Sequence, residues 1–159
     1  MSVAPRSARA EAAAYGSASE PVAEKVRAVA AGERLAAPHA VDLECASTLR
    51  GLVRGGKRPA DEGARALDLL GRMRLRRFDH VPLLPRIWEL RHTMWPYDAS
   101  YVALAEVLGV ELVTVDRKFA GTPDLKCPVR NLRNEREPAD RVVVPGGGPG
   151  RCMARSAWS

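Results

Sequence analysis

Two neighbouring stretches decide the fold: YDASYVALAE at residues 97–106 and ELVTVD at residues 111–116. In the first stretch Asp98 precedes apolar residues at helical spacing, and Gly109 follows where helices commonly end. In the second, an apolar run ends at Asp116, as in a buried strand that emerges at its carboxyl end. Loops at that end of parallel strands build α/β active sites, so both carboxylates are candidates, although Asp98 could simply stabilise the helix amino end.

Outward from these stretches, helices and strands alternate. The patterns predict helices over residues 20–32, 41–54, 59–71, 82–91 and 98–109, and strands over residues 35–38, 76–82, 112–115 and 127–132. This alternation is typical of an α/β fold with a parallel sheet. We expect one folded domain over residues 20–132, because residues 1–19 have no apolar repeat and residues 133–159 are rich in Gly, Pro and Arg. Both ends are predicted to be disordered.

The net charge of +6 and a pI near 9.7 suit a polyanionic partner. The basic residues are nevertheless spread along the chain, and the densest group, at residues 72–77, could equally be a solvated surface. The three cysteines, Cys45, Cys127 and Cys152, lack disulfide or zinc-site spacing. No segment approaches the roughly 20 apolar residues that cross a bilayer, and no secretory signal is evident. We therefore predict a soluble cytoplasmic protein without a membrane partner.

Three acids occupy element ends or first turns in separate α/β units: Glu44, Asp98 and Asp116. The topology of a parallel sheet can bring such residues to one edge. Converging carboxylates repel unless a cation lies between them, and Mg²⁺ or Mn²⁺ suits such oxygen ligands. Metal-assisted phosphodiester hydrolysis would follow. The spacing alone also allows three helix caps or surface charges.

Four segments carry a family resemblance: APHAVDLE at 37–44, LPRIWELRH at 84–92, YDASYVALAE at 97–106 and LVTVD at 112–116. From residue 35 to residue 132 the chain resembles a PIN-domain ribonuclease of the VapC toxin type. The resemblance implies a three-layer α/β/α sandwich and a Mg²⁺-dependent endoribonuclease, with Mn²⁺ able to substitute. It also implies an RNA substrate, a VapB-type antitoxin within a type II toxin-antitoxin system, and a homodimer.

Carried over by position, Glu44, Asp98 and Asp116 match three of the four acids of the family's metal site. Thr114 matches the polar residue before the last acid, and Arg91 matches a recurrent arginine suited to phosphate contact. The resemblance further implies products with a 3′-hydroxyl and a 5′-phosphate. An ion pair with Glu89 is an equally open interpretation of Arg91.

The amino end departs from the family, whose first strand ends in an Asp that binds metal. Residues 1–10 contain neither an apolar strand nor an Asp, so the first strand is predicted to be missing or degraded. Two alternatives therefore stay open: a catalytically inactive PIN-like module that binds antitoxin or RNA, and a frameshifted remnant. The aromatic residues Trp88, Tyr97 and Tyr101 have the spacing of packed helix residues, which favours a core or dimer-interface role over base stacking.

Overall fold

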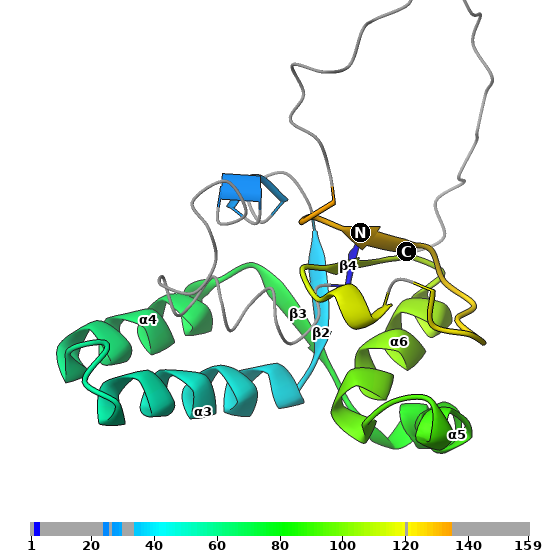
Figure 1. The fold of residues 1–159 in the computed structure, drawn as a ribbon, viewed down its shortest axis with the longest axis horizontal. Coiled ribbons are helices and arrows are strands. Elements are labelled where there is room, and N and C mark those ends of the chain that lie inside the picture. The colour runs from blue at the N-terminus through cyan, green and yellow to red at the C-terminus, as the bar shows by residue number, and fades with distance from the viewer. Residues whose placement is uncertain (1, 4–23, 26, 30–33, 120, 135–159) are drawn as a thin grey trace, which may run out of the picture.

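The computed structural model describes residues 2–3, 24–25, 27–29, 34–119 and 121–134. Its parallel sheet has the strand order β3-β2-β1-β4-β5 (Figure 1). The strands are β1 (Ser2–Val3), β2 (Leu35–Pro38), β3 (Leu75–Phe78), β4 (Glu111–Thr114) and β5 (Val129–Asn131). The helices with full bounds are α3 (Ala40–Arg54), α4 (Ala60–Arg72), α5 (Leu84–Glu89) and α6 (Pro96–Leu108), with 3-10 turns η1 (Val81–Leu83), η2 (Leu90–His92) and η3 (Arg117–Phe119). Residues 24–25 and 27–29 are also helical, within the helix predicted over residues 20–32.

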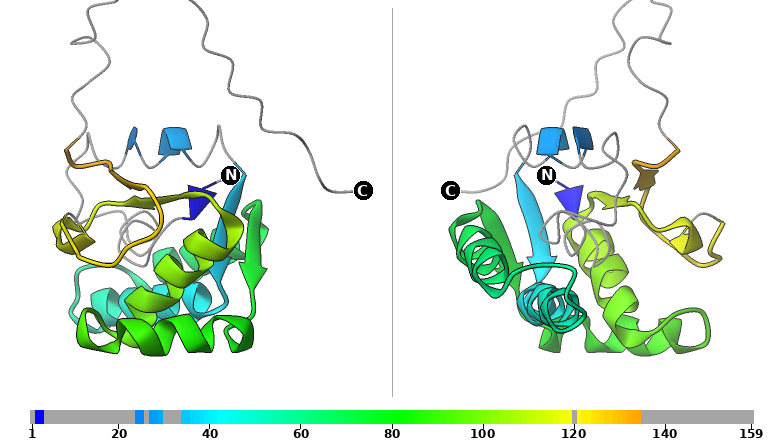
Figure 2. Two further views of the ribbon diagram at one scale, coloured as in Figure 1. Left: turned by 90° about the vertical axis from the view of Figure 1, so that its right-hand side faces the viewer. Right: turned by 60° about the vertical axis from the view of Figure 1, so that its left-hand side comes forward.

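The sheet lies between two helical layers. The hairpin of α3 and α4 occupies one side, and α5 with α6 occupies the other, as two views agree (Figures 1 and 2). Helix α6 packs against β1, β2 and β4. This arrangement confirms the predicted α/β/α sandwich around a parallel sheet.

The first strand, predicted to be missing or degraded, is present at the centre of the sheet but spans only two residues, so only the prediction that it is missing is wrong. Ser2 pairs with Leu35 and Glu111, while Val3 pairs with the following residue of each neighbouring strand. A parallel ladder is made by main-chain hydrogen bonds, which need no particular side chain, so two residues in extended geometry can bridge β2 and β4. The predictions for residues 4–23 and for the tail from 135 to 159 lie outside the described residues.

The core explains why α6 begins and ends where it does. Its side chains are buried almost all round, which is typical of a helix enclosed by protein. Pro96 occupies the first turn, where its missing N–H costs nothing, and Gly109 ends the helix in a left-handed conformation with φ of 61°. The helix predicted over residues 98–109 therefore forms almost as expected.

The region between β3 and α6 differs from the prediction of one strand over 76–82 and one helix over 82–91. The strand ends at Phe78, which pairs with the last residue of β2, and Pro82, which cannot donate to a ladder, lies in η1. The helical segment is divided into η1, α5 and η2, with Pro85 in the first turn of α5. Arg91 consequently lies on a 3-10 turn. No helix among the described residues is both long and apolar enough to span a membrane.

Candidate metal and active site

Asp98 lies in the first turn of α6. Trp95 precedes the helix in extended geometry, and Pro96 sets the backbone angle of the first turn. Only 4% of the Asp98 side chain is exposed. The partial positive charge at the helix amino end stabilises a carboxylate there, although burial still demands a charged or hydrogen-bonding partner.

Asp116 follows β4 at the carboxyl edge of the sheet and is held by hydrogen bonds on several sides. Its N–H donates to Oγ1 of Thr114 at 2.9 Å, and its carbonyl accepts a hydrogen bond from Nδ2 of Asn131 at 3.0 Å. Its Oδ1 accepts the N–H of Lys118 at 3.0 Å. Thr114, which is fully buried, therefore acts on the site by fixing the backbone of Asp116.

A single ammonium group joins the two carboxylates. Nζ of Lys118 lies 2.8 Å from Oδ2 of Asp98 and 3.3 Å from Oδ2 of Asp116. Burial alone would lower the pKa of Lys118, but the hydrogen bonds and negative charges of both aspartates outweigh it and raise that pKa. The structure thus brings Asp98 and Asp116 together around one cation.

Glu44 lies in the first half of α3 and faces the same helix, α6. Its side chain is buried, and its Oε2 accepts a hydrogen bond from the Tyr101 hydroxyl at 2.7 Å. Tyr101 is one turn beyond Asp98 on α6, so Glu44 is held near that end of α6. Among the described residues, however, no three acidic, histidine or cysteine side chains lie close enough to hold one metal ion.

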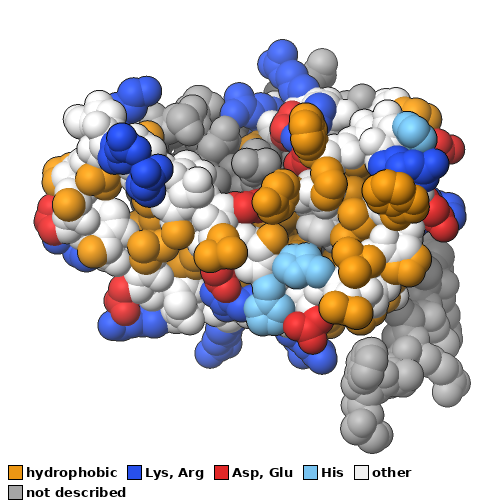
Figure 3. Space-filling model, turned by 90° about the horizontal axis from the view of Figure 1, so that it is seen from below, with side chains coloured by type: hydrophobic (Ala, Val, Ile, Leu, Met, Phe, Trp, Pro, Cys, Tyr) orange, Lys and Arg blue, Asp and Glu red, His pale blue; other side chains and the backbone are white. Residues whose placement is uncertain are grey.

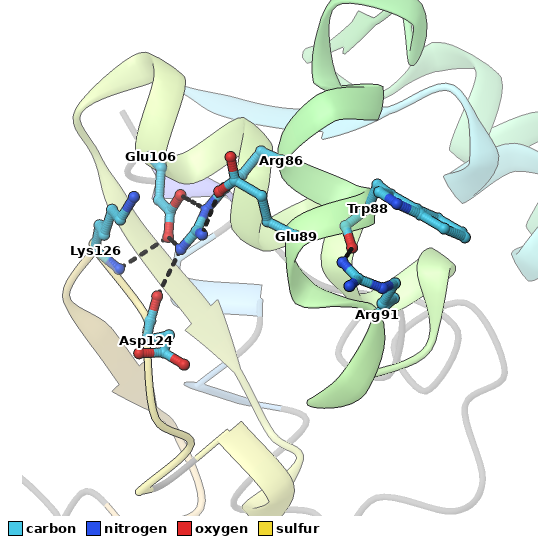
Figure 4. Close-up of polar contacts among 7 residues, drawn as sticks. All are labelled: Arg86, Trp88, Glu89, Arg91, Glu106, Asp124 and Lys126. Carbon is cyan, nitrogen blue, oxygen red and sulfur yellow. Dashed lines mark hydrogen bonds and ion pairs between the residues drawn. The ribbon is translucent and has the colours of Figure 1, made fainter.

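Arg91 lies on the 3-10 turn η2. Its Nη1 donates to the carbonyl of Trp88 at 2.9 Å, and its guanidinium lies 5.1 Å from the centroid of the Trp88 ring (Figure 4). The alternative ion-pair partner, Glu89, binds Arg86 instead. Arg91 is exposed, so its guanidinium is accessible to a phosphate.

The aromatic residues do not all pack as predicted. Tyr101 is fully buried, but 70% of Trp88 and 56% of Tyr97 are exposed. A core role is therefore wrong for both residues. Trp88 lies on the solvent-exposed side of α5, and Tyr97 lies in the exposed first turn of α6. An interface with another chain stays a prediction for both.

A second polar cluster, which the sequence patterns did not reveal, joins α5 to α6 and to the loop before β5 (Figure 4). Arg86 donates to both carboxylate oxygens of Glu106, at 2.7 and 3.1 Å, to Oε2 of Glu89 at 2.8 Å, and to the carbonyl of Asp124 at 2.6 Å. The backbone N–H of Lys126 donates to the same Glu106 at 2.8 Å. The hydrogen bonds to Glu106, against the effect of burial, raise the pKa of Arg86 further above its already high value.

The residues at the acid pair fit a divalent cation. The two aspartates present oxygen atoms only, which is the donor type that Mg²⁺ and Mn²⁺ prefer, and they already converge on a positive charge. Glu44 supplies a further buried carboxylate against the same helix. Asp98 and Asp116 are the residues that would hold the ion, whereas Glu44 is not brought close enough to them among the described residues to complete a three-ligand group.

Comparison with known proteins agrees with this fold. The family model described as "PIN domain" matches residues 12–125. The chain therefore belongs to the PIN domain family, and within it to the VapC type. It is 45% identical over 105 residues to VapC ribonuclease Mb0985 of Mycobacterium bovis and to ribonuclease VapC9 of Mycobacterium tuberculosis, covering 66% of this chain and 83% of each relative.

Two further relatives lie at greater distance. Ribonuclease VapC1 of Mycobacterium tuberculosis is 39% identical over 98 residues, or 61% of this chain and 74% of that protein. A chain of the crystal structure of VapBC2 from Rickettsia felis, bound to a DNA fragment from their promoter, matches with a TM-score of 0.59 at 16% identity. That match covers 82% of this chain and 97% of the other, and at this identity it supports the fold alone.

Proposed function

We propose that this protein is the toxin of a type II toxin-antitoxin system and acts as a metal-dependent endoribonuclease. The observation that carries the proposal is the convergence of Asp98 and Asp116 on one cation at the carboxyl edge of the sheet. It occurs in a chain 45% identical to proteins named VapC ribonucleases. Loops at this edge are where α/β proteins of many kinds place their active sites.

The residues would divide the work as follows. Asp98 and Asp116 would hold Mg²⁺ or Mn²⁺, and the family pattern assigns Glu44, which this structure holds through the Tyr101 hydroxyl, as a further ligand. The bound ion would supply Lewis-acid stabilisation of phosphate charge and a water of lowered pKa. Thr114 keeps Asp116 at the strand end, and Tyr101 orients Glu44 through its hydroxyl. The products would be a 3′-hydroxyl and a 5′-phosphate.

Arg91 is proposed as a substrate-binding residue. Its guanidinium is exposed, lies over the Trp88 ring, and donates from Nη1 to the Trp88 carbonyl. Its other N–H groups are directed away from that carbonyl. A planar guanidinium can donate two parallel hydrogen bonds to a phosphate. RNA would therefore approach from the side of η2.

A VapB-type antitoxin and a second copy of this chain are the proposed protein partners. Apolar side chains gather on the face of the molecule shown in Figure 3, and apolar patches of this kind are typical of protein interfaces. Exposed large apolar residues on α3, α4, η1, α5 and the start of α6 include Leu43, Leu69, Val81, Leu84, Trp88 and Trp95.

We place the protein in the cytoplasm, which agrees with the free thiols of Cys45 and Cys127.

The test is cleavage of a labelled RNA pool with Mn²⁺, with EDTA, and by the Asp98→Asn variant. Cleavage should require Mn²⁺ and fall at least about 100-fold in the variant, because a bound metal supplies several kcal/mol of transition-state stabilisation. Asp68→Asn, which alters an exposed acid paired with Arg72 on α4, is the matched control and should leave the rate unchanged. Equal cleavage by wild type and Asp98→Asn would refute the assignment.

One observation favours a second candidate, a catalytically inactive PIN-like module that binds antitoxin or RNA. Residues 1–10 contain no Asp to match the family's first metal ligand. A folded protein that binds Mn²⁺ and RNA but cleaves none of the pool would establish that candidate. Circular dichroism of the same preparation supplies the evidence of folding.

A further inference from the structure

Lys118 stands out because its ammonium group lies between the carboxylates of Asp98 and Asp116. Its Nζ is 2.8 Å from Asp98 and 3.3 Å from Asp116. We propose that Lys118 is an internal counter-ion, which neutralises this acid pair in the metal-free protein and has to be displaced when a divalent cation binds. The inference rests on the proposed function, because it concerns the same acid pair.

The first step of the argument is the need of Asp98 for a partner. Its side chain is 4% exposed, and a buried carboxylate without a countercharge destabilises a fold strongly. Lys118 provides that charge while its own side chain remains 49% exposed. A flexible, half-exposed lysine can leave the pair for solvent, whereas Asp98 cannot.

The second step is that the backbone at residue 118 does not depend on the side chain. The Lys118 N–H donates to Oδ1 of Asp116 at 3.0 Å, and the Lys118 carbonyl accepts a hydrogen bond from Oγ1 of Thr122 at 2.6 Å. Neither bond involves the ammonium, so we expect both to persist when it is removed. Substitution of the side chain therefore tests the charge without changing the path of the loop.

The third step is electrostatic. An ammonium ion and a divalent cation repel each other, and a cation bound between the two carboxylates competes with the ammonium for Oδ2 of Asp116 and Oδ2 of Asp98. Metal binding therefore has to break the hydrogen bond from Lys118 to that carboxylate. Hydrogen bonds to charged groups contribute about 1.5–3 kcal/mol, which corresponds to roughly 10- to 100-fold in affinity.

Calorimetric titration of the metal-free protein with MnCl₂ tests this competition without RNA. Lys118→Met should bind Mn²⁺ roughly 10- to 100-fold more tightly than wild type, while Lys118→Arg, which keeps a positive charge, should not. Lys57→Met is the matched control for the loss of one positive charge. Lys57 lies just after the carboxyl end of α3, whereas Glu44 lies near the amino end of that helix. Equal or weaker Mn²⁺ binding by Lys118→Met, or no binding by wild type, would overturn the proposal.

A second measurement uses the wild-type chain, so it does not depend on the folding of a variant. The amines are acetylated briefly with and without Mn²⁺, and modification at each lysine is quantified by mass spectrometry. Acetylation of Lys118 should increase severalfold when Mn²⁺ releases it from the aspartates, while that of Lys57 stays constant. Unchanged reactivity of Lys118 at saturating Mn²⁺ would overturn the proposal. Normal displacement of Lys118 without RNA cleavage would instead contradict the ribonuclease assignment alone.

Discussion

Arg86→Met is the substitution whose effect on stability is best defined by the structure. Arg86 is 17% exposed and its partner Glu106 is 9% exposed, so the pair is largely withdrawn from water. Removing one partner of a buried pair costs about 3–5 kcal/mol, because the other charge stays buried. We expect the lower end, about 3 kcal/mol of unfolding free energy, since the backbone N–H of Lys126 still donates to Glu106.

Urea unfolding followed by circular dichroism measures this loss, which is large against a typical domain stability of about 5–15 kcal/mol. Arg72→Met is the matched control, because Arg72 and Asp68 form an exposed pair on α4 that should contribute less than about 1 kcal/mol. Adding Glu106→Gln to Arg86→Met should recover part of the loss by removing the unpaired charge. If Arg86→Met is no more destabilising than Arg72→Met, the interpretation of this cluster as a structural clamp is refuted.

Four further outcomes are expected. Tyr101→Phe should lower kcat for RNA cleavage by about 10- to 100-fold, with little change in KM, because it removes the bond that orients Glu44; an unchanged kcat would contradict that role. Arg91→Met should reduce the salt slope of RNA binding, measured by fluorescence anisotropy in an inactive background, by about 1, and an unaltered slope would exclude a phosphate contact. Burial, and to a smaller extent the charge of Glu106, raises the pKa of the Cys127 thiol to about 11. Iodoacetamide at pH 8 should therefore label Cys127 roughly 100-fold more slowly in the folded than in the urea-unfolded chain, because the thiolate reacts. Equal labelling rates would contradict the raised pKa. Burial would raise the pKa of Glu106, but its hydrogen bonds to Arg86 and Lys126 lower that pKa below 4.5. The ionised carboxylate therefore stabilises the fold above pH 4.5, and this contribution is lost as the pH falls through the pKa of the folded protein. The stability of Glu106→Gln should fall less steeply with acid than that of wild type, and parallel curves would contradict this.

The α6 and β4 regions could be predicted because their patterns are local. In these regions the order of apolar residues along the chain indicates which residues are buried. An apolar helix face ends at Gly109, and a short apolar run ends at Asp116. The placement of Asp98 at the helix start and of Asp116 beyond the strand followed from the same patterns. Their proximity followed from the shared edge of a parallel sheet.

The pairings that complete the site could not be predicted in this way. Lys118 meets Asp98, and Arg86 meets Glu106, across a separation of 20 residues in each case. Periodicity reports which side of an element is buried, but it does not say which charge on another element faces it. Strand β1 could not be predicted for a different reason, because two residues are too few to show the alternation of a strand.

Helix α6 combines the fold and the candidate site, and this determines how substitutions in it have to be interpreted. Asp98 lies at its start, Tyr101 reaches Glu44, and Glu106 binds Arg86, all from a helix enclosed by the core. A substitution in α6 can therefore abolish activity through unfolding as readily as through the loss of a ligand. Lys118 lies outside α6, and the backbone hydrogen bonds at residue 118 do not involve its ammonium, so its replacement changes the charge at Asp98 from outside the helix. A rise in metal affinity in Lys118→Met combined with a loss in Asp98→Asn would assign the effect to this acid pair, because unfolding cannot tighten metal binding.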